Sequence, residues 1–170
     1  GVGAGIVKSI GISAARETLR TQLGSLVNDA ERGAKLFKEL LDFSDVTPFE
    51  VEPLVNASKQ LLAFGFTADE QKDKLKLLGD AASTVGQDIG DVAFWFGRLK
   101  AASEDTGKVI DAEILNRFTE MGILSAKTKK QLQDLSKAGK NGEAFKLMEK
   151  ELSKFEGGME KLSATLNGLI

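Results

Sequence analysis

Residues 41–66 read LDFSDVTPFEVEPLVNASKQLLAFGF, and this segment holds both prolines of the chain. Thr47-Pro48-Phe49-Glu50 has the pattern of a helix capping box in which proline takes the first helical position, where its missing N–H does no harm. Pro53 cannot lie deep inside a helix, because its ring meets the carbonyl group four residues earlier. The two prolines therefore predict a short turn at 47–50 and then a helix that begins near Glu52, with Pro53 in its first turn.

The same segment closes on Phe64-Gly65-Phe66, which predicts a tight corner between two helices. Apolar residues recur at helical spacing up to Phe64, and a glycine directly after such a stripe is typical of a left-handed helix end. Thr67-Ala68-Asp69-Glu70 then supplies a second capping box for the next helix. We expect Thr47 and Thr67 to cap successive helices, with Phe64 and Phe66 packed on either side of the corner.

Similar signals recur along the whole chain. Each of several helix-capping residues precedes a run of apolar residues at helical spacing, namely Asn28 or Asp29, Asp88, Asp111 and Ser125. No segment alternates apolar and polar residues like a β-strand over more than about four positions. The sequence therefore predicts an all-α fold, an array of about six to eight short antiparallel helices joined by tight corners that glycines and helix caps mark.

We expect the chain to divide into three parts. Residues 1–14 are small and mostly apolar, and we expect them to form a flexible arm or join. Residues 15–125 form the expected helical core, with bounds that follow from the family resemblance described below. Residues 126–170 hold fewer anchors per turn and more lysines, which predicts less firmly packed C-terminal helices. A chain that opens on Gly1 also indicates a piece of a longer protein.

Composition excludes several classes of function. The 170 residues are enough for one buried core, and 42% of them are apolar while 28% are charged, as in ordinary globular proteins. The chain has no cysteine, histidine or tyrosine, so any catalysis would rest on Asp, Glu, Lys, Ser or Thr, and no metal or cofactor is expected. A net charge of −2 gives no indication of nucleic-acid contact, and no apolar stretch reaches the roughly 20 residues of a membrane span.

Phe94-Trp95-Phe96 is the most informative aromatic cluster. At about 100° per residue, Phe96 shares the face of the apolar stripe, Trp95 lies at the edge of that face, and Phe94 points nearly opposite, beside Arg98. Phe94 either enters a second packing layer or forms an exposed contact for another protein, and both interpretations stay open. Phe94, Trp95 and Arg98 are therefore the candidate partner-contact residues.

A series of short motifs runs through the middle of the chain: Thr47-Pro48-Phe49, Leu61-Leu62-Ala63-Phe64-Gly65, Leu78-Gly79-Asp80-Ala81-Ala82, Phe96-Gly97, Gly107-Lys108, Asn116-Arg117-Phe118 and Gly122-Ile123. In order and spacing, this series resembles the helical N-terminal core of tail tape measure proteins from tailed bacteriophages, prophages and related tail-like particles. The resemblance covers roughly residues 15–125. One departure is Leu124, because the family often has proline directly after Gly-Ile.

The resemblance implies a structural protein that is not an enzyme and carries no cofactor. Tape measure proteins occupy the lumen of the tail tube, set its length during assembly and leave ahead of the DNA at infection. The implied partners are tail tube, tail tip or chaperone proteins and other copies of the chain. The implied location is the bacterial cytoplasm during assembly and then the virion tail. Two alternatives stay open, a helical peptidoglycan-cleaving domain that uses only acidic residues and a helical adaptor unrelated to phage.

Overall fold

The structure, a computed structural model, describes residues 2–168, with the side chains of residues 14–168. Within residues 2–168 it contains nine α-helices and one short 3-10 helix but no strand, which confirms the predicted all-α fold. The number of α-helices is slightly above the expected six to eight, because residues 2–27 and 158–166 also form helices. Their bounds are α1 (Val2–Val27), α2 (Ala30–Asp45), α3 (Val51–Ala63), η1 (Ala68–Glu70), α4 (Gln71–Val85), α5 (Ile89–Glu104), α6 (Ala112–Glu120), α7 (Ala126–Lys137), α8 (Asn141–Ser153) and α9 (Gly158–Leu166).

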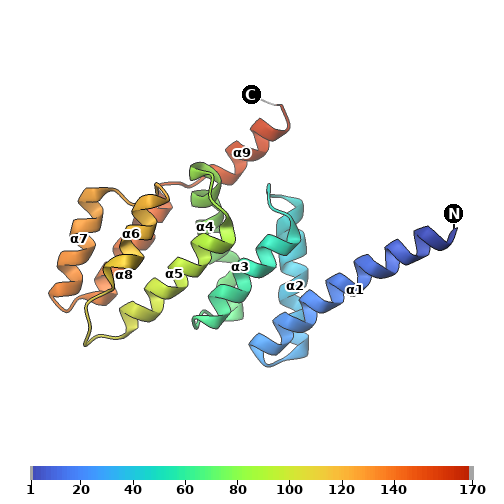
Figure 1. The fold of residues 1–170 in the computed structure, drawn as a ribbon, viewed down its shortest axis with the longest axis horizontal. Helices are drawn as coiled ribbons and strands as arrows, with labels where there is room; N and C mark the ends of the chain where they lie inside the picture. Colours follow the sequence, from blue (N-terminus) through green and yellow to red (C-terminus); the bar gives the residue numbers. More distant parts are fainter. Residues whose placement is uncertain (1, 169–170) are drawn as a thin grey trace.

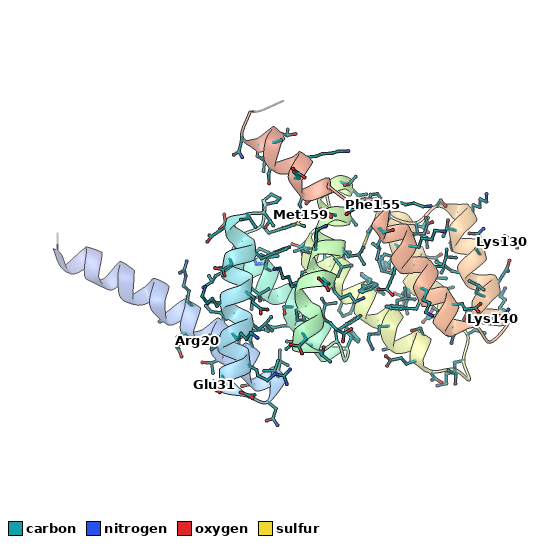
Figure 2. All side chains as sticks on the ribbon, turned by 180° about the vertical axis from the view of Figure 1, so that it is seen from behind. Arg20, Glu31, Lys130, Lys140, Phe155 and Met159 are labelled. Carbon is teal, nitrogen blue, oxygen red and sulfur yellow. The ribbon has the colours of Figure 1, made fainter. Side chains whose placement is uncertain are left out.

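The helices form an elongated array, with α7 at one end and the first half of α1 projecting from the other (Figure 1). Helix pairs build this array, with α1 against α2, α3 against α5, α7 against α8 and α4 against α9. Figure 2 shows Arg20 and Glu31 near one end of the packed body and Lys130 and Lys140 near the other. Residues 2–14, predicted as a flexible arm or join, have a helical backbone and belong to α1.

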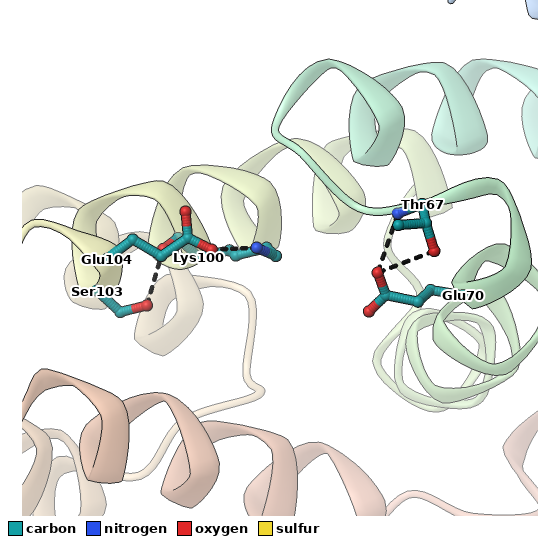
Figure 3. Close-up of polar contacts among 5 residues, drawn as sticks. All are labelled: Thr67, Glu70, Lys100, Ser103 and Glu104. Carbon is teal, nitrogen blue, oxygen red and sulfur yellow. Dashed lines mark hydrogen bonds and ion pairs between the residues drawn. The ribbon is translucent and has the colours of Figure 1, made fainter. Parts of the chain in front are cut away.

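α5 lies at the centre of the array, because it packs against α3, α4, α6 and α8. Phe96 on α5 is fully buried and lies between two other rings, with centroid distances of 5.5 Å to Phe66 and 5.2 Å to Phe145. Lys100, which pairs with Glu104 (Figure 3), covers the Phe66 ring at 5.0 Å. The buried face of α5 holds the residues that helical spacing predicted for it: Ile89, Val92, Phe96 and Leu99.

The turn before α3 lies where the two prolines predicted it, but Thr47 does not form the predicted helix cap. Pro53 lies in the first turn of α3, as expected. Glu50 is the N-cap residue and makes no side-chain capping bond, whereas the Thr47 hydroxyl accepts only a long bond of 3.4 Å from the Phe49 N–H. The prediction that Thr47 caps a helix is therefore wrong.

The carbonyl group of Phe49 explains why the helix starts late. In a helix that began at the first proline, this carbonyl group would need a hydrogen bond from the backbone N–H of residue 53. Residue 53 is a proline and has no N–H to donate. The Ser44 hydroxyl donates to the carbonyl instead, at 2.9 Å, and the first helical bond runs from the Leu54 N–H to the Glu50 carbonyl. The second proline thus delays the start of α3 until after Glu50.

The corner after α3 has the predicted geometry. Gly65 has a φ of +100°, a conformation that glycine adopts at no steric cost. The Phe66 N–H donates to the Leu61 carbonyl at 3.0 Å and the Gly65 N–H donates to the Leu62 carbonyl at 3.1 Å, which is the bond pair of a Schellman motif. Phe64 and Phe66 each contact an aromatic ring of α5. The corner therefore fixes both rings against the central helix.

Thr67 and Glu70 form the capping box at the start of the next helical segment. The Glu70 carboxylate accepts the backbone N–H of Thr67 at 3.0 Å and the Thr67 hydroxyl at 3.1 Å (Figure 3). The backbone bond is the main reason why the pKa of Glu70 lies below its ordinary value, and burial of the carboxyl group partly opposes this shift. The box holds η1, which leads directly into α4.

Replacing Thr67 with alanine is expected to cost about 1 kcal/mol of folding free energy, because the cap loses its hydroxyl. Thr47→Ala is the matched control and should cost less, since Thr47 caps no helix. Urea denaturation of both variants measures the difference. Equal losses for the two variants would contradict the role assigned to Thr67.

The Glu70 bond also predicts a pH dependence of stability. Because the folded-state pKa of Glu70 is depressed, the carboxylate stabilises the fold above its ordinary pKa of 4.5. This contribution is lost as the pH falls through the lower folded-state pKa. Glu70→Gln should therefore be less stable than the parent chain at neutral pH and differ little from it in strong acid. Denaturation midpoints across this range test the prediction, and a stability difference that stays constant with pH would count against it.

A buried polar network ties the start of α8 to the loop before α6. The Asn141 side-chain amide donates to the carbonyl groups of Asp105 at 3.1 Å and Lys108 at 2.8 Å. Its oxygen accepts the Ser136 hydroxyl at 2.7 Å, and the Ser136 oxygen in turn accepts the Ile110 N–H at 2.7 Å. The sequence does not predict this network, because helical spacing carries no information about a side chain that bonds the backbone of another segment.

A residue of α4 caps the last helix. The buried Asp80 carboxylate accepts the backbone N–H of Met159 at 3.0 Å, and its second oxygen lies 3.5 Å from the Lys76 ammonium group. A Cβ atom on Gly158 would lie 2.2 Å from the Asp80 carbonyl oxygen, so only glycine fits at this contact. Figure 2 shows Met159 where α9 meets the array. Gly157 and Gly158 thus lie at the start of α9.

The loop between α7 and α8 is expected to be the first site of proteolytic cleavage. Residues 137–140 are all exposed, and exposed loop tips are preferred cleavage sites. Limited trypsin digestion followed by mass spectrometry should give first cuts within 137–142. First cuts within 75–100 would contradict the prediction that residues 126–170 are less firmly packed than the core.

Candidate protein-contact surface

The three predicted contact residues lie together on α5, where side chains from two neighbouring elements join them. We call Phe64, Phe94, Trp95, Arg98 and Arg117 the aromatic–arginine surface. Phe94 is central, since its ring meets Phe64 edge-on at 5.8 Å between centroids and Trp95 edge-on at 5.2 Å. Tryptophan and arginine are among the residue types that contribute most to binding at protein interfaces.

Two guanidinium groups lie over the Trp95 ring. Arg98 is 5.0 Å and Arg117 is 5.4 Å from the ring centroid, and Arg98 is also 5.9 Å from the Phe94 ring. A cation at such a distance gains about 0.5–1 kcal/mol at an exposed site. Stacking holds the plane of an arginine while its N–H groups stay available for hydrogen bonds. The rings therefore hold the two guanidinium groups at this surface.

Gly97 and the corner after α3 position the aromatic part of the surface. A Cβ atom on Gly97 would lie 2.3 Å from the Phe64 ring, so Phe64 can approach α5 only at a glycine. Phe64 is also the C-cap residue of α3, and the Schellman bonds that follow it fix the direction of the chain there. These two features place Phe64 beside Phe94.

Arg117 belongs to the aromatic–arginine surface, but sequence reasoning did not predict this. This residue comes from α6 and reaches Trp95 across the loop between α5 and α6. On α6 its guanidinium lies 3.7 Å from the Glu113 carboxylate and 3.2 Å from the Glu120 carboxylate. Helical periodicity within α5 carries no information about such a contact. The available signal was the Asn116-Arg117-Phe118 motif.

In the structure, Phe94 is neither fully buried in a second packing layer nor fully exposed for another protein. Phe94 and Trp95 are both half-buried, so each ring packs on neighbours and also reaches solvent. Beside Trp95 lies a hollow of about 260 Å³, lined by Gln87, Asp91, Trp95, Arg117, Glu120 and Met121. The surface thus offers a partner aromatic rings surrounded by charged groups. A role of these residues in partner contact stays a prediction.

Neither a metal-binding group nor a membrane-spanning helix is found among the described residues. Residues 14–168 contain no group of three or more Asp, Glu, His or Cys side chains that could hold a metal ion. The pKa of Glu70 is lowered, which is the opposite of what a carboxylic general acid needs. Among the described helices, none has both the length and the apolar character needed to cross a bilayer.

Comparison with known proteins identifies no relative of this chain. No family model, no curated protein and no solved structure matches the chain. Function is therefore inferred from two observations, the motif resemblance and the geometry of the aromatic–arginine surface.

Proposed function

We propose that this chain is an assembly domain of a tape measure protein from a phage or prophage tail. It takes part in tail length determination and tail tube assembly, and it is released before the DNA is ejected. It acts through its helix surfaces and not as an enzyme. Its partners are tail tube, tail tip or chaperone proteins, and it passes from the bacterial cytoplasm into the virion tail.

The observation that carries this proposal is that the motifs behind the resemblance contact one another. The Phe49 ring lies against Gly79, where an added Cβ atom would be only 3.2 Å from it, and the Phe64 ring lies against Gly97 in the same way. Phe118 is fully buried. The residues that resemble the family thus set the contacts between helices, as expected for a structural domain.

The aromatic–arginine surface supports a role in protein contact. Half-buried aromatic rings stacked with arginines are the kind of group on which binding energy concentrates at protein interfaces. These rings are held by α3, α5 and α6, so the surface is built on regular elements and is ready to bind without rearrangement.

Tail particles from a strain that carries the gene test the proposal. Mass spectrometry should detect the chain in purified tails, and the Trp95→Ala, Arg98→Ala double variant should reduce the number of complete tails seen by electron microscopy. Arg32→Ala is the control, because Arg32 is an exposed residue of α2 away from the surface. Absence of the chain from tails would overturn the proposal. Clearing of peptidoglycan by the purified chain would support the enzymatic alternative instead.

A further inference from the structure

Lysines gather at the end of the array that α7 forms. Residues 126–148 hold six lysines and only two acidic residues, although the whole chain has a net charge of −2. We call four exposed lysines of this segment the basic face: Lys127, Lys130 and Lys137 on α7, and Lys140 in the loop that follows it. Figure 2 shows Lys130 and Lys140 near this end of the packed body. The positive charge of the chain is therefore concentrated locally.

Helical geometry turns the three lysines of α7 in the same direction. At about 100° per residue, Lys127, Lys130 and Lys137 lie within about 80° of one another around the helix axis. The side of α7 that packs against α6 and α8 carries other residues, of which Thr128, Leu132 and Ser136 are buried. Lys127 and Lys137 are about 15 Å apart along the axis. The lysines thus form one stripe on the exposed side of the helix.

The protein itself neutralises little of this charge. Lys130 pairs with Asp134 at 3.0 Å, whereas the other three lysines of the basic face have no carboxylate within ion-pair distance among residues 14–168. Glu143 is the second acidic residue of 126–148, and the segment keeps an excess of lysine over both acids. Four carboxylates of the neighbouring helices pair with bases outside the basic face: Glu113 and Glu120 with Arg117, Glu149 with Lys74, and Glu151 with Lys154.

The residue types of the basic face fit phosphate groups better than a protein or a membrane. Lysine is depleted at protein interfaces, whereas its compact ammonium group is a common phosphate ligand. A helix that lies on a membrane needs bulky apolar side chains for insertion, but Leu132 is buried and Leu135 is half-buried. A nucleic-acid duplex carries one negative charge for about every 1.7 Å of its axis. It therefore offers several phosphates along the stripe.

We propose that the basic face binds the phosphate backbone of a double-stranded nucleic acid without reading its sequence. α7 has no aromatic ring on which an unpaired base could stack and no arginine for the edge of a guanine. Its contacts stay with the phosphates, which carry no sequence information directly. Four lysines predict a Kd of about 10⁻⁴ M at physiological salt, as for weak non-specific binding. The inference depends neither on the aromatic–arginine surface nor on the tape measure assignment.

Fluorescence anisotropy of a short labelled DNA duplex tests the proposal with the full chain. At low ionic strength the parent chain should bind two duplexes of unrelated sequence equally, and its affinity should fall steeply as salt rises. The Lys127→Gln, Lys130→Gln, Lys137→Gln variant should bind about tenfold more weakly or worse. The slope of log K against log salt should also fall by about 3, one for each lost phosphate contact.

The matched control is the Arg32→Gln, Lys35→Gln, Lys38→Gln variant. These three bases are likewise exposed along one side of a helix, α2, and their replacement removes the same charge. Residues 29–45 also contain five acidic residues, so this side of the molecule does not attract phosphates. The control variant should bind the duplex within about twofold of the parent chain. A change of net charge alone would instead weaken both variants equally.

Lysine acetylation of the parent chain gives a second readout that needs no variant. Bound duplex should protect the lysines of the basic face from an amine-reactive reagent and leave Lys35 and Lys38 reactive, as mass spectrometry can measure. Vesicles of phosphatidylcholine with phosphatidylglycerol serve as the membrane probe and should bind the chain more weakly than the duplex does.

Three results would overturn the proposal: no binding of the duplex at low ionic strength, equal weakening by the α7 and α2 variants, or tighter binding to the vesicles than to the duplex. The proposed function fails by a different result. Absence of the chain from purified tails would reject the tape measure assignment and leave nucleic-acid binding by the basic face standing.

Discussion

Replacing Phe96 with alanine is expected to remove about 3–5 kcal/mol of the free energy of unfolding. Phe96 is fully buried on α5, which packs against four other helices. Its ring stacks between Phe66 and Phe145, and it thereby connects the corner after α3 with α8. Helices fixed on several sides cannot collapse into the cavity left by the ring, so the loss should lie in the upper part of the range for core residues. Chemical denaturation measures it.

Phe94→Ala is the matched control for this prediction, since Phe94 lies two residues away on the same helix. Its ring is half-buried, so its removal should cost less than half as much as removal of the Phe96 ring. Phe94→Ala should instead weaken association with whatever covers the aromatic–arginine surface. If both substitutions lower stability equally and association stays unaltered, Phe94 is a core residue and the contact role is rejected.

Asn141→Ala is expected to destabilise the fold more than Thr67→Ala does. Asn141 is 1% exposed and bonds the Ser136 hydroxyl and the carbonyl groups of Asp105 and Lys108. Its removal takes one hydrogen bond from each of these groups, although Asp105 and Ser136 keep their bonds to the N–H groups of Lys108 and Ile110. Each lost bond is expected to cost about 0.5–1.5 kcal/mol. The loop before α6 should also open more easily. Urea denaturation measures the stability loss, and faster trypsin cleavage near that loop reports its opening.

Asn56→Ala supplies the control for Asn141. Asn56 is an exposed residue within α3, where alanine has the higher helix propensity, so this change should be neutral or slightly stabilising. If Asn141→Ala costs no more than Asn56→Ala, the buried network contributes nothing to stability.

The features that the sequence predicts correctly depend on bonds between residues close along the chain. The Schellman bonds at Gly65 and the capping box of Thr67 and Glu70 need only a few consecutive residues. Thr47 fits the same capping pattern and still caps no helix. Its case differs because Pro53 cannot supply the N–H that the Phe49 carbonyl would need. A capping motif therefore predicts a helix start only where the next turn can complete its hydrogen bonds.

The features that the sequence does not predict join residues far apart. The Asp80 carboxylate caps α9 from 79 positions away, and Asn141 bonds a carbonyl 36 positions away. Arg117 reaches Trp95 from another helix. Hydrophobic periodicity gives the buried face of each helix but not its neighbour, so these contacts depend on the tertiary arrangement. The glycines at 79, 97 and 158 mark where helices approach closely, yet the sequence does not say which surface each one meets.

The most direct test of the tape measure assignment is to measure the tail length of particles produced from a gene that lacks these residues. The coding region for the 170 residues is deleted in frame, and electron microscopy measures the tails that form. The assignment predicts that tails are missing or have an abnormal length. Tails of normal length and normal number, formed without these residues, would contradict it.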